Sequence, residues 1–314
     1  MINREIKING STKTIQGDKD YLGKMDADFE PDTVAILAAL CDVDSVALDI
    51  GANIGLTALA LSDICFAGKV IAIEPVPRTF ELLKTNLADA NVQNVSTFNV
   101  AIGAGDGSVS MYVDESNLAT SFVVDIDKGS NQEIPLTSLD SMVSRLAIPP
   151  LDFIKIDVEG CELEVLKGAE KSISLFKPIV LLEMNHWCLN VFRRISLPEF
   201  RDQLLQIFPF VYAVDKGSFL DFSDAVNAGK IYEAHVFANK YMNIVAGFDQ
   251  ADLLARLSTL AEREISEPVA AAAQINTPVV CAAESELNAM LNSRSWKITA
   301  PLRQFHAWIK NGRS

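Results

Sequence analysis

The stretch Asp49-Ile50-Gly51-Ala52-Asn53-Ile54-Gly55 follows an apolar run that begins at Ser45 and precedes a segment with helical spacing that ends at Leu61. Because the run is apolar almost without a break, it predicts a strand covered on both faces, as in a parallel sheet. Glycines at a strand-to-helix turn allow the backbone to approach a ligand closely. The stretch therefore predicts a ligand-binding turn at the carboxyl end of a parallel strand.

The glycine pattern of this turn separates two classes of nucleotide ligand. A dinucleotide site has the pattern GxGxxG, but counted from Gly51 the second and third glycines are replaced by Asn53 and Leu56. S-adenosylmethionine has no pyrophosphate, and its ammonium and sulfonium groups favour an acid such as Asp49. Glu74, which ends the next apolar run, can accept hydrogen bonds from both ribose hydroxyls. We therefore interpret the turn as an S-adenosylmethionine site; the alternative role for Glu74 is to cap the following helix.

The rest of the chain alternates between predicted strands and helices, which favours βαβ units and a mostly parallel sheet. A turn-rich, alternating stretch over 103–137 predicts an inserted hairpin. The first helix follows a short polar lead and is expected to begin at a cap formed by Asp32 or Thr33. Further helices are predicted over 79–90, 162–173, 198–207 and 249–264. The predicted strands are 45–50, 69–74, 95–100, 151–157, 178–183, 210–214 and 234–239.

Composition narrows the class of protein. Lys and Arg number 27 against 41 Asp and Glu, so the net charge is −14, and 49% of the residues are hydrophobic. This content excludes global disorder, and the acidic balance argues against a nucleic-acid partner. No apolar run approaches the roughly 20 residues that span a bilayer. The five cysteines are scattered without a CxxC pair, so we expect reduced thiols and a cytoplasmic location.

A second acidic cluster follows another predicted central strand. Asp157 and Glu159 come directly after that strand, Glu183 ends the next strand, and His186 lies just beyond it. Ligands of an open parallel sheet bind outside the carboxyl ends of the strands, where the strand order reverses. We therefore expect these four side chains to converge on the side of the site that holds a methyl acceptor.

Several motifs in order resemble the FkbM-type methyltransferase family over roughly residues 20–240. The resemblance implies a class I methyltransferase fold, which is a Rossmann-like α/β fold with a mostly parallel seven-stranded sheet and an antiparallel last strand. It also implies S-adenosylmethionine as the donor and usually an oxygen acceptor on a sugar, glycoside or polyketide-like product. The motifs are Phe29-Glu-Pro31, Asp49-Ile-Gly-Ala-Asn-Ile-Gly55, Ile73-Glu-Pro75, Asn99-Val-Ala-Ile102, Ser138-Leu-Asp140, Phe153-Ile-Lys-Ile-Asp-Val-Glu-Gly-Cys-Glu162 and Val165-Leu-Lys-Gly-Ala169.

The resemblance also assigns roles to individual residues. Glu74 would hold the ribose, Ala101 would lie beside the adenine, and Glu30 would reach the methionine end. The residues that would approach the cofactor through their backbone are Gly51, Asn53 and Gly55.

Two mechanisms for activating the acceptor are open. In the first, His186, Asp157 or Glu159 acts as a general base towards a hydroxyl of high pKa. In the second, Asp157 and Glu183 bind Mg²⁺ or Mn²⁺, which polarises the hydroxyl. We predict an O-methyltransferase that acts on a sugar hydroxyl in cell-surface polysaccharide or glycan synthesis. The alternatives are methylation of a small natural product or glycoside, and a non-catalytic scaffold.

The predicted organisation leaves a C-terminal appendage. We expect an N-terminal lead and helix over 1–45, a methyltransferase domain over 46–240, a helix over 241–265, a linker over 266–283 and a basic, Trp-containing tail over 284–314. Part of the tail, 293–303, resembles a short tail of bacterial glycosyltransferases and related surface-glycan enzymes. The tail could bind the inner face of the membrane or a glycan-assembly partner. The alternative is an amphipathic helix packed on its own domain or in a homo-oligomer.

Overall fold

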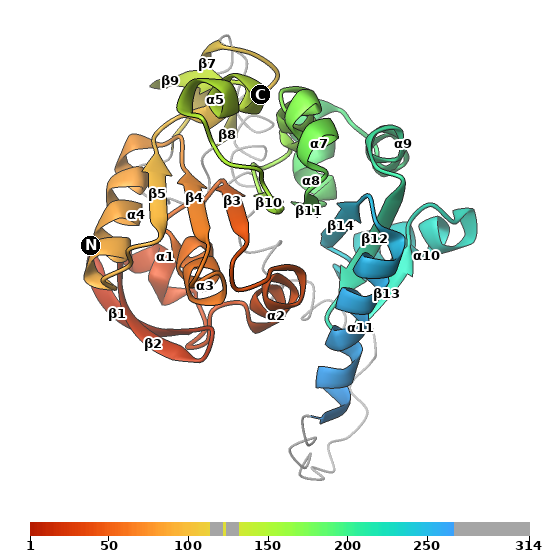
Figure 1. Cartoon of the computed structure of the whole chain (residues 1–314), viewed down its shortest axis with the longest axis horizontal. Coiled ribbons are helices and arrows are strands. Elements are labelled where there is room, and N and C mark those ends of the chain that lie inside the picture. The colour runs from red at the N-terminus through yellow and green to blue at the C-terminus, as the bar shows by residue number, and fades with distance from the viewer. Residues whose placement is uncertain (114–121, 124–131, 267–314) are drawn as a thin grey trace, which may run out of the picture.

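The computed structural model describes residues 1–113, 122–123 and 132–266, and a twisted central sheet organises them (Figure 1). Within these residues β11, β10, β3, β4 and β5 are parallel neighbours, whereas β14 lies antiparallel between β11 and β12. In spatial order the eight strands are β13 (Ser218–Asp221), β12 (Phe210–Asp215), β14 (Asn243–Gly247), β11 (Ile179–Glu183), β10 (Phe153–Ile156), β3 (Val46–Ile50), β4 (Lys69–Ile73) and β5 (Val95–Phe98). The mostly parallel sheet with an antiparallel late strand is confirmed, and β13 adds an eighth strand at its edge.

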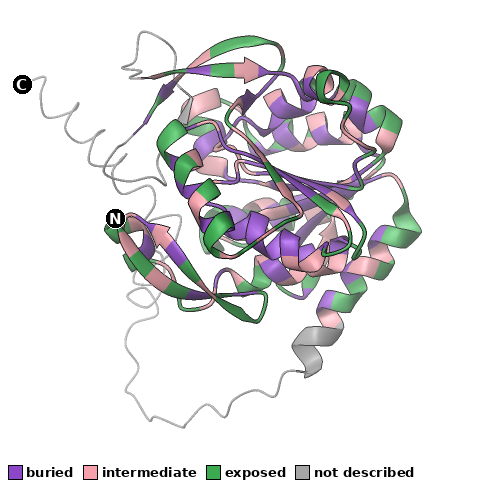
Figure 2. Ribbon diagram, turned by 60° about the vertical axis from the view of Figure 1, so that its left-hand side comes forward, coloured by how far each residue is buried: buried purple, intermediate pink, exposed green. Residues whose placement is uncertain are grey.

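Two helical layers cover the sheet, and the alternation of side chains along each strand supplies both cores (Figure 2). Ala47 faces one layer and Leu48 the other, and both are fully buried. The first layer contains α2 (Pro31–Leu40), α3 (Leu56–Ile64), α4 (Pro77–Asp89) and α11 (Gln250–Ser266). The second contains α5 (Leu139–Leu146), α6 (Glu162–Lys167), α7 (Glu170–Phe176), α9 (Leu197–Ile207) and α10 (Ala225–Ala238). The continuous apolar runs of the strands are therefore explained by burial on both faces.

The N-terminal lead is a β-hairpin, which the sequence analysis missed. β1 (Ile2–Ile8) and β2 (Ser11–Gly17) pair antiparallel, and the alternating Ile6, Ile8 and Ile15 are fully buried. A short helix, α1 (Lys19–Gly23), follows it. The next helix begins at Pro31 after Glu30, so the expected cap at Asp32 or Thr33 is wrong.

Two other predicted elements are wrong. The helix expected over 162–173 is divided into α6 and α7 at Gly168, where a Cβ atom would lie 1.9 Å from the carbonyl oxygen of Gly103. The strand expected over 234–239 belongs to α10, and the strand that completes the sheet is β14. The sheet therefore continues past residue 240, which was the expected end of the domain.

The inserted hairpin is confirmed as part of a small separate sheet beside the main one. β7 (Gly107–Tyr112) pairs antiparallel with β9 (Gln132–Thr137) and with β8 (Phe122–Val123), and β6 (Ala101–Ile102) pairs parallel with β9. Among the described residues, no helix is long and apolar enough to cross a membrane. The linker beyond Ser266 and the tail over 284–314 lie outside the described residues, so their roles stay predictions.

Asp140, in the Ser138-Leu-Asp140 motif, holds the start of α7. Its Oδ1 accepts hydrogen bonds from the Ser172 N–H (2.8 Å) and hydroxyl (2.6 Å), and its Oδ2 accepts one from the Lys171 N–H (3.0 Å). We expect Asp140→Ala to lower the free energy of unfolding by about 1–3 kcal/mol, because helix N–H groups lose their acceptor. Denaturant unfolding measures this change. Glu233→Ala, at an exposed helix position, should shift it by less than about 0.5 kcal/mol, and equal losses in both variants would contradict the assignment.

Candidate functional site

A pocket of about 920 Å³ lies at the carboxyl ends of the central strands. Its lining comes from the residues that follow β3, β4, β10 and β11, together with α1, the start of α2 and the small sheet. The chain runs from β3 to β4 and β5 on one side, and β10 and β11 lie on the other. The pocket therefore lies where the strand order reverses, which is where open parallel sheets bind ligands.

The glycine turn forms one wall of the pocket. Gly51 (φ +86°), Asn53 (φ 49°) and Gly55 (φ +97°) have left-handed backbone conformations. At Gly51 a Cβ atom would lie 1.9 Å from the carbonyl oxygen of Asp157, so only glycine fits between the ends of β3 and β10. Gly51 and Asn53 line the pocket, whereas Gly55 does not: a Cβ atom there would lie 2.7 Å from Cδ1 of Leu83 in α4.

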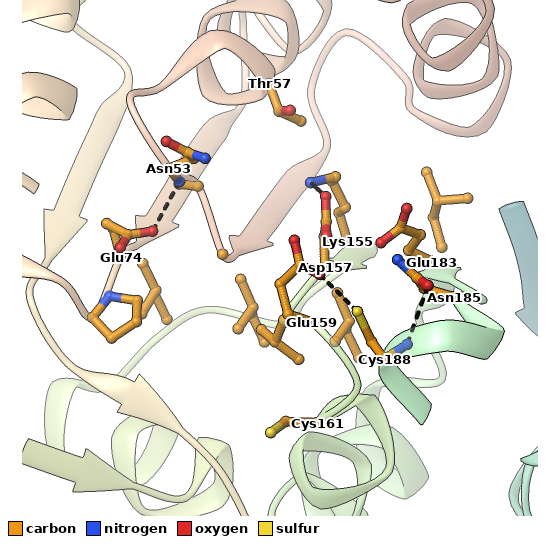
Figure 3. A pocket seen from close by; sticks show the side chains of 18 of the residues that line it. Asn53, Thr57, Glu74, Lys155, Asp157, Glu159, Cys161, Glu183, Asn185 and Cys188 are labelled. Carbon is orange, nitrogen blue, oxygen red and sulfur yellow. Dashed lines mark hydrogen bonds and ion pairs between the residues drawn. The ribbon is translucent and has the colours of Figure 1, made fainter. Parts of the chain in front are cut away.

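Glu74 lies beside this turn (Figure 3). Its Oε2 accepts a hydrogen bond from the Asn53 N–H (3.0 Å), and its Oε1 accepts one from the Val76 N–H (2.9 Å). Burial raises the pKa of Glu74 to about 7, although these two N–H groups oppose the shift. Val76 directly precedes α4, so Glu74 both supports the helix start and lines the pocket.

Of the remaining residues predicted to bind the cofactor, two line the pocket and one does not. Glu30 precedes α2, and Ala101 belongs to β6; both line the pocket. Asp49 is fully buried and is absent from the lining; instead its Oδ1 lies 3.5 Å from the ammonium of Lys155. The sequence analysis missed Tyr21 of α1, which also lines the pocket and whose pKa is raised by burial and then by Glu30.

Lys155 is the cation at the centre of the site. Its ammonium donates a hydrogen bond to Asp157 Oδ2 (3.1 Å) and lies close to Asp49. Burial lowers the pKa of Lys155, but the charges of Asp157 and Asp49 outweigh burial and raise it above its usual value. The side chain therefore stays charged and holds the two carboxylates near each other.

The opposite side of the pocket carries two further carboxylates. Glu159 has a left-handed backbone (φ 52°), and its Oε2 accepts a hydrogen bond from the Cys188 thiol (3.1 Å). Burial, and then the charge of Asp157, raise its pKa to about 7. The side chain of Glu183 forms no hydrogen bond or ion pair with the described residues. Burial, followed by the charges of Asp157 and Glu159, raises its pKa well above the usual value. Figure 3 shows Glu74 and Asn53 on one side, Glu183 and Cys188 on the other, and Asp157 between them.

His186 is not brought to these acids, contrary to the expected convergence. It is absent from the pocket lining, and its ring packs edge-on against His235 with the ring centroids 5.0 Å apart. Its backbone N–H donates a 3.4 Å hydrogen bond to His235 Nε2, and burial lowers its pKa. The geometry gives His186 a packing role beside the pocket.

The geometry does not support the expected metal site. Asp157 and Glu183 line the same pocket, but Asp157 is paired with Lys155. In the described part of the chain, no group of three or more His, Cys, Asp or Glu side chains is arranged to hold a metal ion. The structure thus gives Asp157 and Glu183 no third ligand of this kind among the described residues, and the Mg²⁺ or Mn²⁺ site stays a prediction.

The strand order and the pocket at its reversal define an α/β protein with the class I methyltransferase fold. The model of the methyltransferase FkbM domain matches residues 49–208, about half of the chain, so this chain belongs to the FkbM methyltransferase family.

Several known proteins are similar to the chain. The hexuronic acid methyltransferase AglP of Haloferax volcanii is 29% identical over 160 residues, which are 51% of this chain and 64% of that protein. Methyltransferase 1 of Beauveria bassiana is 29% identical over 147 residues, 40% of this chain and 59% of that protein. The chain thus spans less than two thirds of these relatives. The crystal structure of an FkbM methyltransferase from Methylobacillus flagellatus has 22% identity and a TM-score of 0.40, covering 55% of this chain and 40% of that one.

Glu162, the first residue of α6, supports the loop between β10 and α6. Its Oε1 accepts hydrogen bonds from the N–H groups of Gly160 (3.0 Å) and Val158 (3.3 Å), and only 1% of the residue is exposed. Burial raises its pKa from 4.5 to about 7, against these hydrogen bonds. The folded protein therefore binds this proton more tightly than the unfolded chain does.

The stability of the protein should depend on pH through Glu162. The stabilisation of the folded state by the protonated Glu162 carboxyl is fully present below pH 4.5. It is lost as the pH rises through about 7. We expect the free energy of unfolding of Glu162→Gln, relative to the parent, to rise by roughly 2–3 kcal/mol across this window. Denaturant titrations at several pH values measure it. Glu164→Gln, at a position of the same helix where the side chain is 44% exposed, should show no such rise. Parallel pH curves for Glu162→Gln and the parent would refute the linkage.

Proposed function

We propose that the protein is an S-adenosylmethionine-dependent O-methyltransferase that acts on a sugar hydroxyl in the synthesis of a cell-surface polysaccharide or glycan, in the cytoplasm. The observation that carries the proposal is one pocket that joins the glycine turn and Glu74 to the carboxylate of Glu183, which has no hydrogen-bond or ion-pair partner in the described part of the chain. Family membership supports methyl transfer, and the relative named for hexuronic acid supports a sugar acceptor.

The pocket residues fit S-adenosylmethionine. Gly51 and Asn53 line the pocket at the turn, and Glu74 offers a carboxylate to ribose hydroxyls. Ala101 and Val76 give the same wall an apolar surface for a base. Glu30, at the start of α2, offers a carboxylate to the ammonium of the methionine end. When bound, the donor supplies a methyl group activated on a sulfonium.

Glu74→Ala should weaken S-adenosylmethionine binding about 10- to 100-fold, because hydrogen bonds to a charged group contribute about 1.5–3 kcal/mol. Calorimetric titration measures the Kd. Glu81→Ala serves as a control, since Glu81 is a 70% exposed side chain of α4, and it should bind as the parent does. A parent protein that does not bind S-adenosylmethionine would favour the scaffold alternative.

Among the acids of the pocket, Glu183 is best placed to act as the general base. Asp157 is paired with Lys155, and Glu159 accepts the hydrogen bond of the Cys188 thiol. The Glu183 side chain has neither kind of partner among the described residues, and its raised pKa makes it a stronger base than an ordinary carboxylate. In this mechanism Glu183 orients the sugar hydroxyl and takes its proton as the oxygen attacks the methyl carbon.

Glu183→Gln should lower kcat by at least about 100-fold, since general-base catalysis contributes about 10²–10⁴, while the Kd for S-adenosylmethionine stays unchanged. Release of S-adenosylhomocysteine measures the rate. His186→Asn is the matched test of the rival base and should retain most of the activity. If His186→Asn loses the activity and Glu183→Gln keeps it, the base is misassigned.

Chelation separates this mechanism from the metal alternative. We expect the parent to keep its activity after dialysis against a chelator, because Glu183 and not a cation activates the hydroxyl. The same release assay measures it, with a chelator-treated Mg²⁺-dependent enzyme as the positive control. Loss of activity that Mg²⁺ or Mn²⁺ restores would overturn the base mechanism.

A further inference from the structure

Arg193 lines the pocket with a guanidinium group that has few partners in the described part of the chain. It donates one hydrogen bond, from Nη2 to the sulfur of Cys161, which is a weak acceptor. Its Nε is buried and has no hydrogen-bond partner among the described residues. Because a buried donor of a charged group is costly to leave without an acceptor, this position favours an acceptor that the protein does not supply.

The carboxylates of α6, which follows Cys161, have other partners. Glu164 pairs with Lys167 at 2.7 Å, and Glu162 accepts a hydrogen bond from the Gly160 N–H at 3.0 Å. Among the described residues, no carboxylate forms an ion pair with Arg193. The positive charge of Arg193 is therefore not offset by a direct contact.

The other cations of the lining differ from Arg193. Lys155 is paired with Asp157 at 3.1 Å and also lies close to Asp49. Lys24 and Lys216 are exposed, so solvent screens their charge. Of the described cations of the pocket, only Arg193 combines a buried donor with the absence of a counter-ion.

The backbone at Arg193 is unusual. Leu189–Arg193 form a single π-helical turn, and Arg194 follows with a left-handed backbone (φ 59°). Such turns are rare and are frequent at functional sites. Arg193 lines the pocket, whereas Arg194 is exposed and lies outside the lining. The turn thus gives two consecutive arginines different surroundings.

Arg193 and the proposed general base lie in different parts of the pocket. Burial raises the pKa of Cys161 to about 11, and the charge of Arg193 is the strongest influence against this shift. Figure 3 shows Cys161 apart from Glu183, with Glu159 between them in this view. An acceptor whose hydroxyl lies at Glu183 therefore reaches Arg193 with a different substituent.

On the basis of the proposed function, we propose that the acceptor sugar carries an oxyanion, a carboxylate or a phosphate, which Arg193 binds while Glu183 takes the hydroxyl proton. A guanidinium presents parallel N–H donors that fit such groups bidentately. The oxyanion supplies the counter-charge that the described residues do not give Arg193.

Sugars that differ at one position test the proposal and identify the oxyanion. Methyl glucoside, methyl glucuronide, methyl glucuronamide and methyl glucoside 6-phosphate are compared by kcat/KM. We expect the carboxylate or the phosphate to exceed both neutral sugars at least about tenfold, because hydrogen bonds to charged groups are the strong ones. Neutral sugars that react as fast as both anionic ones overturn the proposal.

Variants of the two consecutive arginines test whether Arg193 is the cause. Arg193→Gln should lower the preference for the anionic sugar about tenfold, and Arg193→Lys, which keeps the charge but loses the planar fork, should lower it less. An unchanged Kd for S-adenosylmethionine shows that each variant is folded. Arg194→Gln should keep the preference of the parent. A preference that neither Arg193 variant lowers overturns the proposal.

Calorimetric titration of the same sugars, with S-adenosylhomocysteine present, separates this inference from the proposed function. Tighter binding of an anionic sugar that depends on Arg193 supports the oxyanion site even without methyl transfer. Equal binding of anionic and neutral sugars by a protein that binds S-adenosylmethionine overturns the oxyanion site, while the assignment as a methyltransferase stands. Failure to bind S-adenosylmethionine overturns the proposed function itself.

Discussion

The ammonium of Lys155, between the carboxylates of Asp49 and Asp157, is the interaction on which the site depends. Lys155 lies opposite Asp49 in the register of β10 and β3, and both side chains are almost completely buried. Without this cation two carboxylates would lie unpaired at the point where the strand order reverses, at a cost of about 3–5 kcal/mol. Lys155 thus offsets one of the two negative charges beside the close approach of Gly51 to Asp157.

The sequence predicted those parts of the fold that local chemistry determines. The apolar runs of β3, β4, β10 and β11 can be recognised because burial on both faces removes polar residues. The glycine turn can be recognised because left-handed backbone at Gly51 and Gly55 tolerates few other residues. The order of these strands and the helices between them was then sufficient to predict a parallel sheet. It also predicted the edge of the sheet at which the pocket lies.

Other features depend on long-range contacts that no local pattern encodes. The strand expected over 234–239 has the composition of a strand but lies in α10, since tertiary packing overrides weak propensities. In the sequence, nothing distinguishes Lys155 from other strand residues. Its role follows from the strand register, which places it opposite Asp49. His186 lies near Glu183 in the sequence, yet the turn after β11 directs its ring towards His235. Proximity in sequence therefore predicted that the acids lie together, but the histidine next to them in the sequence lies outside the pocket lining.

The carboxylates of the pocket also affect how charge moves during methyl transfer. The reaction converts a sulfonium and a hydroxyl into a thioether, a methyl ether and a proton. If Glu183 takes this proton, one positive charge moves across the pocket and the net charge of the pocket stays constant. Burial raises the pKa of Glu183, which favours its protonated form, and the ammonium of Lys155 stays paired with Asp157. A buried site can thus complete the reaction without creating a new uncompensated charge, which would be costly at low dielectric.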